Sequence, residues 1–422
     1  MLWRTNHIMN SKKLIIRIYP KSLFISILIF SLPFCFLLEI NTQIPLVAYW
    51  DELLTVIAVV YCCYLGFRKK LQRIEIVSLI LFLIVIIIGV LSNFIYQVTT
   101  DISSIGIDIV ALLKISVPFF VAKYLAIEDK DRNIARYLLP FSKLFIISAF
   151  LFGTISLFVD IGMSGSERYG IPSFYFITNN EGRLGLIVAS LLLIILMVEQ
   201  NKKKQLFYEF CSILVMIYTT KGTIYIIFIV YLILLIMWRK SYKLTTGNII
   251  ILIIGILSSS IYQIRNYLTD MNSPRMLFFK YGFITANEYF PFGSGFSTFG
   301  SAEAAKNYSP LYYLYGFNKI WGLNPVENMF LNDCYLAMIL GQFGYFGLLL
   351  FLLAMLIIFT SINKCFYENK KSKALAFGLF IALAVSTIGS AIMKSSIGVF
   401  CLVIIGLFAG YSQSYNKLEN MN

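Results

Sequence analysis

Residues 75–96 read EIVSLILFLIVIIIGVLSNFIY, an apolar run whose one charged residue, Glu75, stands at its start. A helix needs roughly 20 mostly apolar residues to cross the hydrocarbon core of a bilayer, so this run predicts a membrane-spanning helix. The whole chain agrees, because 59% of its 422 residues are hydrophobic and 13% are charged, whereas soluble domains carry about 25% charged residues. The composition excludes a soluble multidomain protein, a disordered chain and a disulfide scaffold.

We therefore expect an all-α polytopic membrane protein, with about 12 transmembrane helices and one large extracytoplasmic loop, built as a single membrane domain over residues 1–422. The run 22–38 lacks a small-residue cleavage site, so we expect it to stay as the first helix. The twelve expected spans are 22–38, 46–66, 75–96, 105–125, 137–159, 184–198, 206–219, 222–238, 246–262, 332–360, 374–392 and 396–411.

The segment 206–238 is the least certain part of this count. A single helix of that length would measure about 50 Å at 1.5 Å per residue, which exceeds a bilayer core of about 30 Å. We expect two helices that turn at residues 219–222. This arrangement also keeps Lys202–Lys204 and Arg239–Lys243 on one side.

Basic residues predict the orientation, because cytoplasmic connections of membrane proteins are enriched in Lys and Arg. With the N-terminus in the cytoplasm, every cytoplasmic connection is basic, including residues 68–73, 130–136, 202–204 and 370–373. We expect a cytoplasmic (inner) membrane protein with both termini in the cytoplasm. The net charge of +14 is then a signal of topology and of contact with anionic lipid, and no nucleic-acid partner is expected.

Outside the membrane, residues 263–331 form by far the longest connection. It is rich in Tyr, Phe, Asn and Gly, and its aromatic density argues against disorder. We expect a folded cap over the outer mouth of the helices. Tyr312, Tyr313, Tyr315 and Trp321 within it could stack on sugar rings or form an interfacial aromatic belt. The run 291–296 (PFGSGF) could be a phosphate-binding loop or a tight turn, and the turn is favoured because the strand and helix of a phosphate loop are missing.

Of the nine cations on the predicted outer side, where the topology rule should deplete them, five are expected to cluster. Arginine side chains match phosphate oxygens in a bidentate manner, so these cations predict a site for an anionic headgroup such as diphosphate. The alternative is that they pair with local acids, Arg168 with Glu167 and Arg183 with Glu181, or with lipid phosphates. The five residues are Arg168, Arg183, Lys221, Arg265 and Arg275.

Two acids on the outer side are candidates for a general base, Asp333 and Glu327. Asp333 begins a long apolar run, where a partly desolvated carboxylate has a raised pKa suited to proton transfer. The alternative is that Asp333 is an acid at a helix N-terminus that complements the helix dipole, or that Asn332 or Asp333 is the N-cap. Within the span 105–125, Asp108 and Lys114 are six residues apart, not quite on one helical face; ionisable groups at membrane depth are often functional.

No metal ion or cofactor is expected. His7 is the only histidine, and no CxxC pair occurs, so the zinc-type spacings are absent.

Four short motifs resemble the O-antigen polymerase and ligase superfamily, and most closely the Wzy-type polysaccharide polymerases. Residues Arg168–Gly170 with Asn179–Arg183 resemble the family's third outer loop, and Thr220–Gly222 resemble its Ser-Arg-Gly position, with Lys in place of Arg. Arg275 with Pro291–Phe296 resembles the Arg and Pro-x-Gly-x-Gly of the family's large loop. Asn332–Leu336 with Gly341–Gly347 resembles the start of the span that follows this loop.

This resemblance implies metal-independent glycosyl transfer between two polyprenyl-diphosphate-linked oligosaccharides at the outer membrane face. It implies diphosphate and sugar binding by Arg168, Arg183, Lys221, Arg265, Tyr313 and Trp321, and catalysis by Arg275 with Asp333 or Glu327 as base. Membrane lipid, a chain-length regulator and a flippase are the partners it implies. The product would be the O-antigen of lipopolysaccharide or a capsule.

Other functions remain open at this point. The ligase branch of the family uses a histidine in the large loop, and this chain has none after His7. A flippase or transporter of lipid-linked oligosaccharides predicts short loops on both sides, unlike 263–331. Integral-membrane glycosyltransferases with a large first outer loop do not fit the short connection 39–45.

Overall fold

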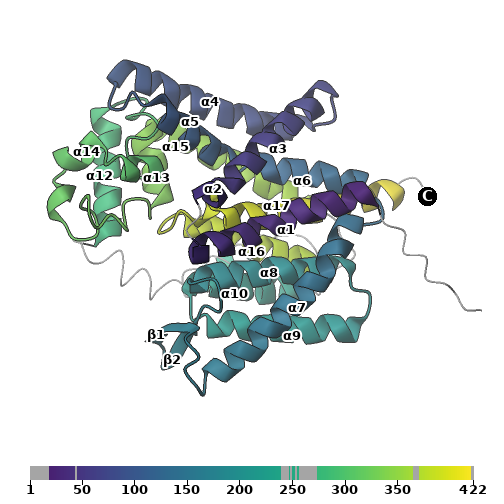
Figure 1. The fold of residues 1–422 in the computed structure, drawn as a ribbon. Coiled ribbons are helices and arrows are strands. Elements are labelled where there is room, and N and C mark those ends of the chain that lie inside the picture. The colour runs from purple at the N-terminus through teal and green to yellow at the C-terminus, as the bar shows by residue number, and fades with distance from the viewer. Residues whose placement is uncertain are drawn as a thin grey trace, which may run out of the picture.

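The computed structural model describes residues 19–42, 45–238, 273–364 and 370–419, with single positions between 247 and 255. This part of the chain is almost entirely helical (Figure 1). The described part also contains a two-stranded antiparallel hairpin, formed by β1 (Ser164–Arg168) and β2 (Ile171–Phe174).

Seven helices in the described part are long and apolar enough to cross a membrane. They are α1 (Pro20–Thr42), α3 (Trp50–Phe67), α4 (Arg73–Tyr96), α7 (Asn133–Ser156), α8 (Glu181–Val198), α15 (Tyr335–Asn363) and α17 (Ser396–Glu419). An eighth crossing is formed if α5 (Ile102–Leu113) and α6 (Val117–Glu128), which are bent by 46° at Lys114–Ser116, count as one span. The polytopic membrane class is therefore confirmed.

The expected count of twelve spans is not confirmed. Three expected spans are helices that fall short of a full crossing: α9 (Lys202–Tyr218), α10 (Gly222–Met237) and α16 (Lys370–Ser386), of 17, 16 and 17 residues. At 1.5 Å per residue such helices reach about 25 Å, less than the bilayer core. The expected span 246–262 lies mostly outside the described residues.

The expected turn inside 206–238 is confirmed. Helix α9 ends at Tyr218, and α10 begins at Gly222 after Thr220, whose φ is +47°. Lys371 Nζ contacts Glu209 Oε2 at 2.5 Å, and Lys370 Nζ contacts the carbonyl oxygen of Trp238 at 2.5 Å. The beginning of α9 and the end of α10 thus meet the start of α16, as a helical hairpin requires.

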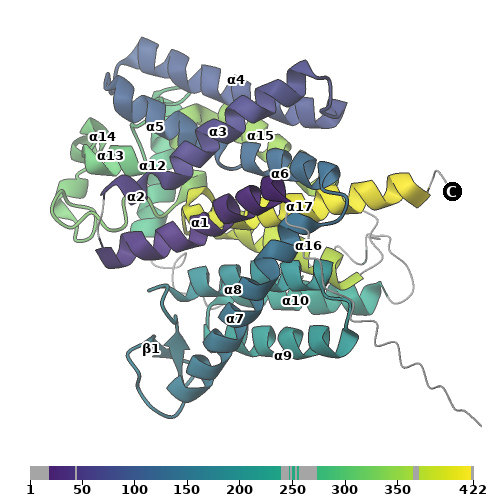
Figure 2. The same ribbon diagram turned by 45° about the vertical axis from the view of Figure 1, so that its right-hand side comes forward.

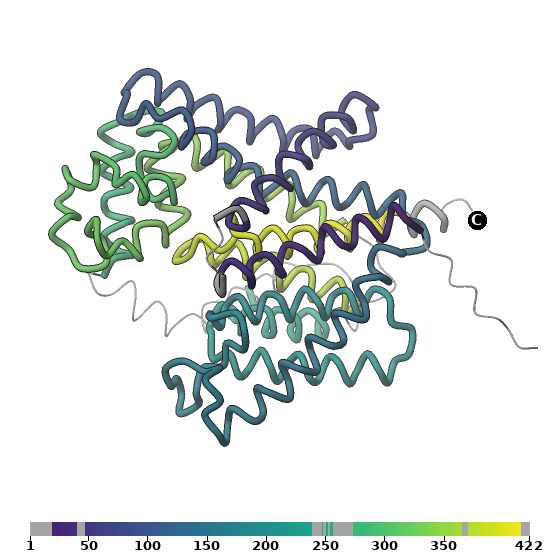
Figure 3. Tube along the Cα trace, in the orientation of Figure 1, coloured from purple at the N-terminus to yellow at the C-terminus, as the bar shows by residue number. Residues whose placement is uncertain are grey.

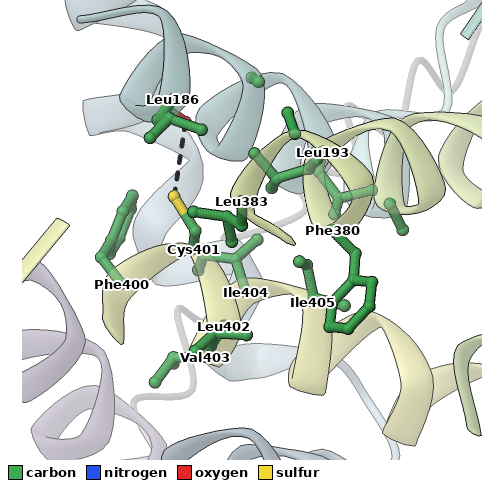
Figure 4. Packing of buried hydrophobic residues seen from close by; sticks show 14 of the residues in the cluster. Leu186, Leu193, Phe380, Leu383, Phe400, Cys401, Leu402, Val403, Ile404 and Ile405 are labelled. Atoms are coloured by element: carbon green, nitrogen blue, oxygen red, sulfur yellow. Dashed lines mark hydrogen bonds between the residues drawn. The ribbon is translucent and has the colours of Figure 1, made fainter. Parts of the chain in front are cut away.

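At the centre of the bundle, α8 and α17 are the most enclosed spans, because 89% of the residues in the apolar stretch of each are buried. Helix α16 lies against both. In Figure 4 the thiol of Cys401 on α17 donates to the carbonyl oxygen of Leu186 on α8, at 3.8 Å, among Phe380 and Leu383 of α16. Helices α3 and α4 expose apolar faces, as expected for faces that contact lipid.

Residues 273–331 fold at one end of the bundle, together with the β1–β2 hairpin (Figures 1 and 2). They form α12 (Pro274–Glu288), α13 (Ala302–Lys306), α14 (Pro310–Leu314) and the short η1 (Phe317–Lys319). Phe278, Phe299, Tyr312 and Phe317 build a separate apolar core beneath them. These residues form a folded unit, which we call the cap; its place outside the membrane stays a prediction. Residues 263–272 lie outside the described residues.

The opposite end of the bundle carries the end of α17 (Figure 3). Lys21 and Lys70 both contact the carboxylate of Glu128, at 3.0 and 2.8 Å. The start of α1, the α3–α4 connection and the end of α6 are thereby brought to one place.

Candidate functional site

Glu181, the first residue of α8, joins two of the predicted cations. Its Oε1 lies 3.5 Å from Arg168 Nη2, and its Oε2 lies 4.0 Å from Lys221 Nζ. Arg168 ends β1, and Lys221 is the N-cap of α10. The expected local pairs are therefore wrong: Arg168 pairs with Glu181 and not with Glu167, and Glu181 pairs with Arg168 and Lys221 and not with Arg183.

Arg275 and Asp333 form the second half of this site, with Arg275 Nη2 3.5 Å from Asp333 Oδ2. Burial raises the pKa of Asp333 above its usual value, while the positive charges of Arg275 and Lys221 oppose the rise. The charge of Lys221 also acts on Asp333, so the two halves lie within electrostatic range of each other. We call Arg168, Glu181, Lys221, Arg275 and Asp333 the cation cluster.

The alternative role of Asp333 as a helix cap is wrong. Helix α15 begins at Tyr335, and its N-cap is Cys334, with no hydrogen bond from the N-cap side chain. Asp333 instead lies against Arg275, as a partly buried carboxylate with a neighbouring cation.

Four helix N-termini meet at the cation cluster. Glu181 opens α8, Lys221 caps α10, Arg275 is the second residue of α12, and Asp333 lies two residues before α15. A helix N-terminus carries a partial positive charge and backbone N–H groups that bind anions. Three cations and four helix N-termini against two carboxylates make this region attractive to a negatively charged ligand.

The ion pairs of the cation cluster are loose compared with the buried pairs elsewhere. Their N–O distances are 3.5, 4.0 and 3.5 Å, and each cationic side chain is about a quarter exposed (24–26%). By contrast, Lys123–Glu75 and Lys114–Asp51 are 2.5 and 2.8 Å apart and almost fully buried. Charge-assisted hydrogen bonds are about 2.7–2.9 Å long, so these three contacts are longer than typical bonds of that kind.

Strained backbone surrounds the cluster. Tyr169, Asn179 and Thr220 have left-handed φ angles of +57°, +50° and +47°, and each lies within two residues of a charged member of the cluster. For a β-branched residue such as Thr220 this conformation is a true outlier, and such residues gather at functional sites. Within the described part of the chain, the buried hydroxyl of Thr220 has no hydrogen-bond partner, which leaves it available to a ligand.

Arg183 is predicted as a phosphate ligand, but the structure places it apart from the cation cluster. Its guanidinium lies over the ring of Phe36, 4.6 Å from the centroid, and it interacts electrostatically with Glu39 at the end of α1. Position 183 stands two residues after Glu181 on α8, so its side chain points to another face of the helix. Arg265 lies outside the described residues.

A second charged network fills the space between α1, α3 and the break between α5 and α6. Lys114 Nζ lies 2.8 Å from Asp51 Oδ2 and also contacts Glu52, and Glu39 interacts electrostatically with Asp51 and Lys114. Asp108 does not join this pair directly, since it accepts a hydrogen bond of 2.9 Å from the backbone of Ser297 in the cap.

The remaining predicted residues belong to the cap, some on its surface and some in its core. Glu327 is exposed on a turn, where its backbone N–H donates to Asn324 Oδ1 at 2.7 Å; it lacks the desolvation that distinguishes Asp333. Tyr313 and Trp321 are 57% and 63% exposed and could meet a ligand from solvent. Tyr312 and Tyr315 belong to the core of the cap, so stacking of sugars on these two rings is wrong.

The run 291–296 is a tight turn, as favoured, and not a phosphate loop. The N–H groups of Ser294 and Gly295 donate to the carbonyl oxygens of Gly341 and Gln342, at 3.0 and 2.9 Å. Asn93 of α4 bonds Phe296 in both directions, at 2.7 and 2.9 Å. The amides that would bind phosphate are therefore used by the protein itself.

Gly344 shows how closely this turn packs. It interrupts α15 with a φ of +66°, and a Cβ there would lie 2.5 Å from the carbonyl oxygen of Pro291. The turn and the kinked helix fix the cap to the bundle.

Among the described residues, no group of three or more His, Cys, Asp or Glu side chains could hold a metal ion. No protein-family model matches the chain, and no curated protein sequence matches it.

Sequence reasoning identified Arg168, Lys221, Arg275 and Asp333, which the structure brings together. It did not give a role to Thr220. It also did not predict that Glu181 contacts both Arg168 and Lys221. A signal for Thr220 existed in its position directly before Lys221. The pairing of Glu181 could not be predicted from its sequence neighbours, because Arg168 and Lys221 are distant from it in the chain.

Proposed function

We propose that the chain is a polysaccharide polymerase of the Wzy type. It joins polyprenyl-diphosphate-linked oligosaccharide repeat units at the outer face of the cytoplasmic membrane, without a metal ion. The observation that carries this proposal is the cation cluster, which gathers Arg168, Lys221 and Arg275 where four helix N-termini meet. The end of the bundle that holds this cluster and the cap is the outer end, and both termini lie in the cytoplasm.

In the proposed reaction, a sugar hydroxyl of the incoming unit attacks the anomeric carbon of the growing chain. The new glycosidic C–O bond forms as the bond from that carbon to the diphosphate oxygen breaks, and polyprenyl diphosphate leaves. Negative charge grows on the leaving oxygen, and donors aimed at developing charge are the largest source of catalysis in such sites. Arg168, Lys221 and Arg275 provide this stabilisation.

The hydroxyl that attacks must lose its proton. Asp333 is the base in this proposal, because its raised pKa suits proton transfer. The departing diphosphate is the final acceptor of the proton, which balances the reaction. Tyr313 and Trp321 are proposed as sugar contacts from the cap, while Glu327, which is exposed and solvated, is the weaker choice of base.

A second candidate function is a flippase or transporter of lipid-linked oligosaccharides. It is favoured by the buried Lys114–Asp51–Glu52 group at a helix break, since ionisable residues at membrane depth often line transport paths. An O-antigen ligase would also use an anion site at the outer face, but the chain lacks the histidine of that branch.

The test is to delete the gene in its native host and to separate surface polysaccharide by size. Polymerase function predicts that the ladder collapses to a single repeat unit, restored by the wild-type gene and by Lys280→Ala but not by Arg275→Ala. Lys280 is a matched control because it is an exposed cation on the same helix α12. Long chains retained on the lipid carrier would indicate a ligase, and repeat units trapped inside the cell would indicate a flippase.

A further inference from the structure

Lys394 is a lysine buried in the protein interior. It is the last residue of η2 (Ile392–Lys394), in the connection between α16 and α17, and it is 8% exposed. Its Nζ lies 3.7 Å from Met338 Sδ and 5.6 Å from the centroid of the Tyr335 ring, which is within the range of a cation–π interaction. Both residues belong to the beginning of α15, so the ammonium group holds this part of the helix against the connection.

The carboxylate of Asp108 on α5 supplies the opposite charge. It is 6% exposed and interacts electrostatically with Lys394. Asp108 also bonds the cap and α15, because its Oδ2 accepts the N–H of Ser297 at 2.9 Å and its carboxylate accepts side-chain hydrogen bonds from Ser301 and Gln342. Lys394 and Asp108 therefore connect α5, the cap and the beginning of α15 in one charged network.

The same connection contacts both sides of the Arg275–Asp333 pair. Three residues after Asp333, the N–H of Leu336 on α15 donates to the carbonyl oxygen of Thr387 at 3.0 Å. The side chain of Arg275 lies along Gly389, where a Cβ would be 3.4 Å from Cδ and Nε of the arginine. The α16–α17 connection is therefore the surface on which the two members of the pair are aligned.

The charge of Lys394 is the part of this side chain that calls for a reason. Burial of a charged group costs free energy unless the charge is paired, and methionine would fill a similar volume without that cost. The ammonium group attracts a ring, a sulfur atom and a carboxylate that come from different elements, which an uncharged side chain would not do. A displacement of about 1 Å in an active site can lower a rate about 10²-fold, so a fixed point of this kind matters for a pair that meets across two helices.

We propose that Lys394 is a positioning residue for the Arg275–Asp333 pair. It holds the beginning of α15 on the α16–α17 connection, so that Asp333 stays against the guanidinium of Arg275. The inference rests on the proposed function and adds to its site a residue that acts through Tyr335 and Met338. The chemistry of glycosyl transfer stays with the cation cluster.

The experiment compares three variants of the full-length protein in nanodiscs, supplied with lipid-linked repeat units from the gene-deletion strain. Lys394→Met removes the ammonium group and leaves Asp108 without its counter-charge. Lys394→Met with Asp108→Asn removes both charges, so the net charge is unchanged, and the asparagine oxygen can still accept the N–H of Ser297. Lys123→Met with Glu75→Gln is the matched control, because it neutralises a buried lysine pair, 2.5 Å apart, at the other end of the bundle.

We expect the double variant of Lys394 and Asp108 to unfold near the wild-type temperature and to bind undecaprenyl diphosphate as wild type does, but to elongate about tenfold more slowly. A displaced Arg275 opposes the raised pKa of Asp333 less strongly. The pH below which the elongation rate falls should therefore increase by about one unit. The control should keep the wild-type rate and pH dependence.

Equal rates and equal pH dependence in wild type and the double variant of Lys394 and Asp108 would overturn the inference. A loss in Lys394→Met that the double variant repairs would also overturn it, because Lys394 would then only neutralise Asp108. The same loss in the control variant of Lys123 and Glu75 would show a general effect of removing buried charge and would overturn it as well.

Failure of the proposed function appears differently, as wild-type protein that binds the lipid-linked units without lengthening them. In that event the titration of Asp333 is read directly from the infrared band of its protonated carboxyl group, assigned with Asp333→Asn. A higher midpoint in the double variant of Lys394 and Asp108 than in wild type would support the positioning role, and an unchanged midpoint would overturn it.

Discussion

The guanidinium of Arg275 lies 3.5 Å from the carboxylate of Asp333, although the two residues are 58 positions apart in the chain. Arg275 stands in the first turn of α12, and Asp333 precedes α15, so the cap and the bundle both contribute to the pair. This pair is the proposed centre of catalysis.

The pH dependence of elongation should reveal Asp333. Burial raises the pKa of Asp333, and Arg275 opposes the rise. A base acts only when deprotonated, so the rate should increase with pH through this raised pKa. Arg275→Met removes the opposing charge, so the elongation rate that remains in this variant should begin to fall at a higher pH than in wild type. Arg275→Lys keeps the charge, so the pH at which the rate falls should stay nearly unchanged.

Asp333→Asn should abolish this fall at low pH and lower the rate by about 10²–10⁴-fold, the usual range for a general base. The measurement is initial rate against pH in reconstituted protein. A fall at low pH that Asp333→Asn leaves unaltered would assign the titration to another group.

Glu181→Gln should strengthen binding of undecaprenyl diphosphate. The carboxylate of Glu181 competes with phosphate for Arg168 and Lys221, and its neutralisation leaves one more uncompensated positive charge. We expect affinity to rise a few-fold and to depend more steeply on salt, as screened electrostatic attraction requires. Glu199→Gln is the matched control, because Glu199 also pairs with a lysine, Lys143 at 2.5 Å, but at the other end of α8. A loss of affinity in Glu181→Gln would show that this carboxylate positions the cations and does not compete for them.

The Lys114–Asp51 pair should matter for stability. Both side chains are almost fully buried, and breaking a buried pair leaves an uncompensated charge at a cost of about 3–5 kcal/mol. Lys114→Met should therefore lower the thermal midpoint in detergent strongly, and Lys114→Met with Asp51→Leu should recover part of the loss. If the single variant unfolds at the wild-type temperature, the pair is not needed to hold α3 and α5 together. If instead stability holds and only transport of lipid-linked units fails, the flippase alternative gains support.

Gly344→Ala should loosen the cap. The added Cβ would meet the carbonyl oxygen of Pro291 at 2.5 Å, at a φ of +66°, so the kink in α15 and the 291–296 turn cannot both persist. We expect faster proteolysis within the cap and a lower thermal midpoint. Gly106→Ala is the control, because a Cβ at Gly106 on α5 meets nothing within 4 Å. There alanine should be neutral or stabilise by roughly 0.5–1 kcal/mol. Equal protease resistance of the two variants would contradict the role given to the kink.

Apolar runs predicted the existence of helices well, because the length and hydropathy of a span are local properties. They predicted α4 and the α9–α10 turn. They did not predict the 46° break between α5 and α6, because Lys114 is drawn to Asp51 and Glu52 of another helix. The length of α10 followed from the sequence, since Lys221 precedes it and Arg239 follows soon after its end. The end of α16 at Ser386 was not visible, since Ile388, Ala391 and Ile392 continue the apolar character of the run.

The cation cluster could be predicted in part. Arg168, Lys221 and Arg275 stood out because cations are unusual on the predicted outer side. Their partners could not be predicted, since Glu181 and Asp333 reach them only through the fold. Arg183 was placed in the same group on charge alone, and its position on a different face of α8 from Glu181 separates it.

The most direct test of the account is elongation by purified protein in nanodiscs, supplied with lipid-linked repeat units from the deletion strain in the presence of EDTA. The account predicts a ladder of longer chains and stoichiometric release of polyprenyl diphosphate, unaffected by the chelator. It predicts the same ladder from Lys280→Ala and none from Arg275→Ala. Wild-type protein that binds the units without lengthening them, or an Arg275→Ala protein that lengthens them as well as wild type does, would contradict it.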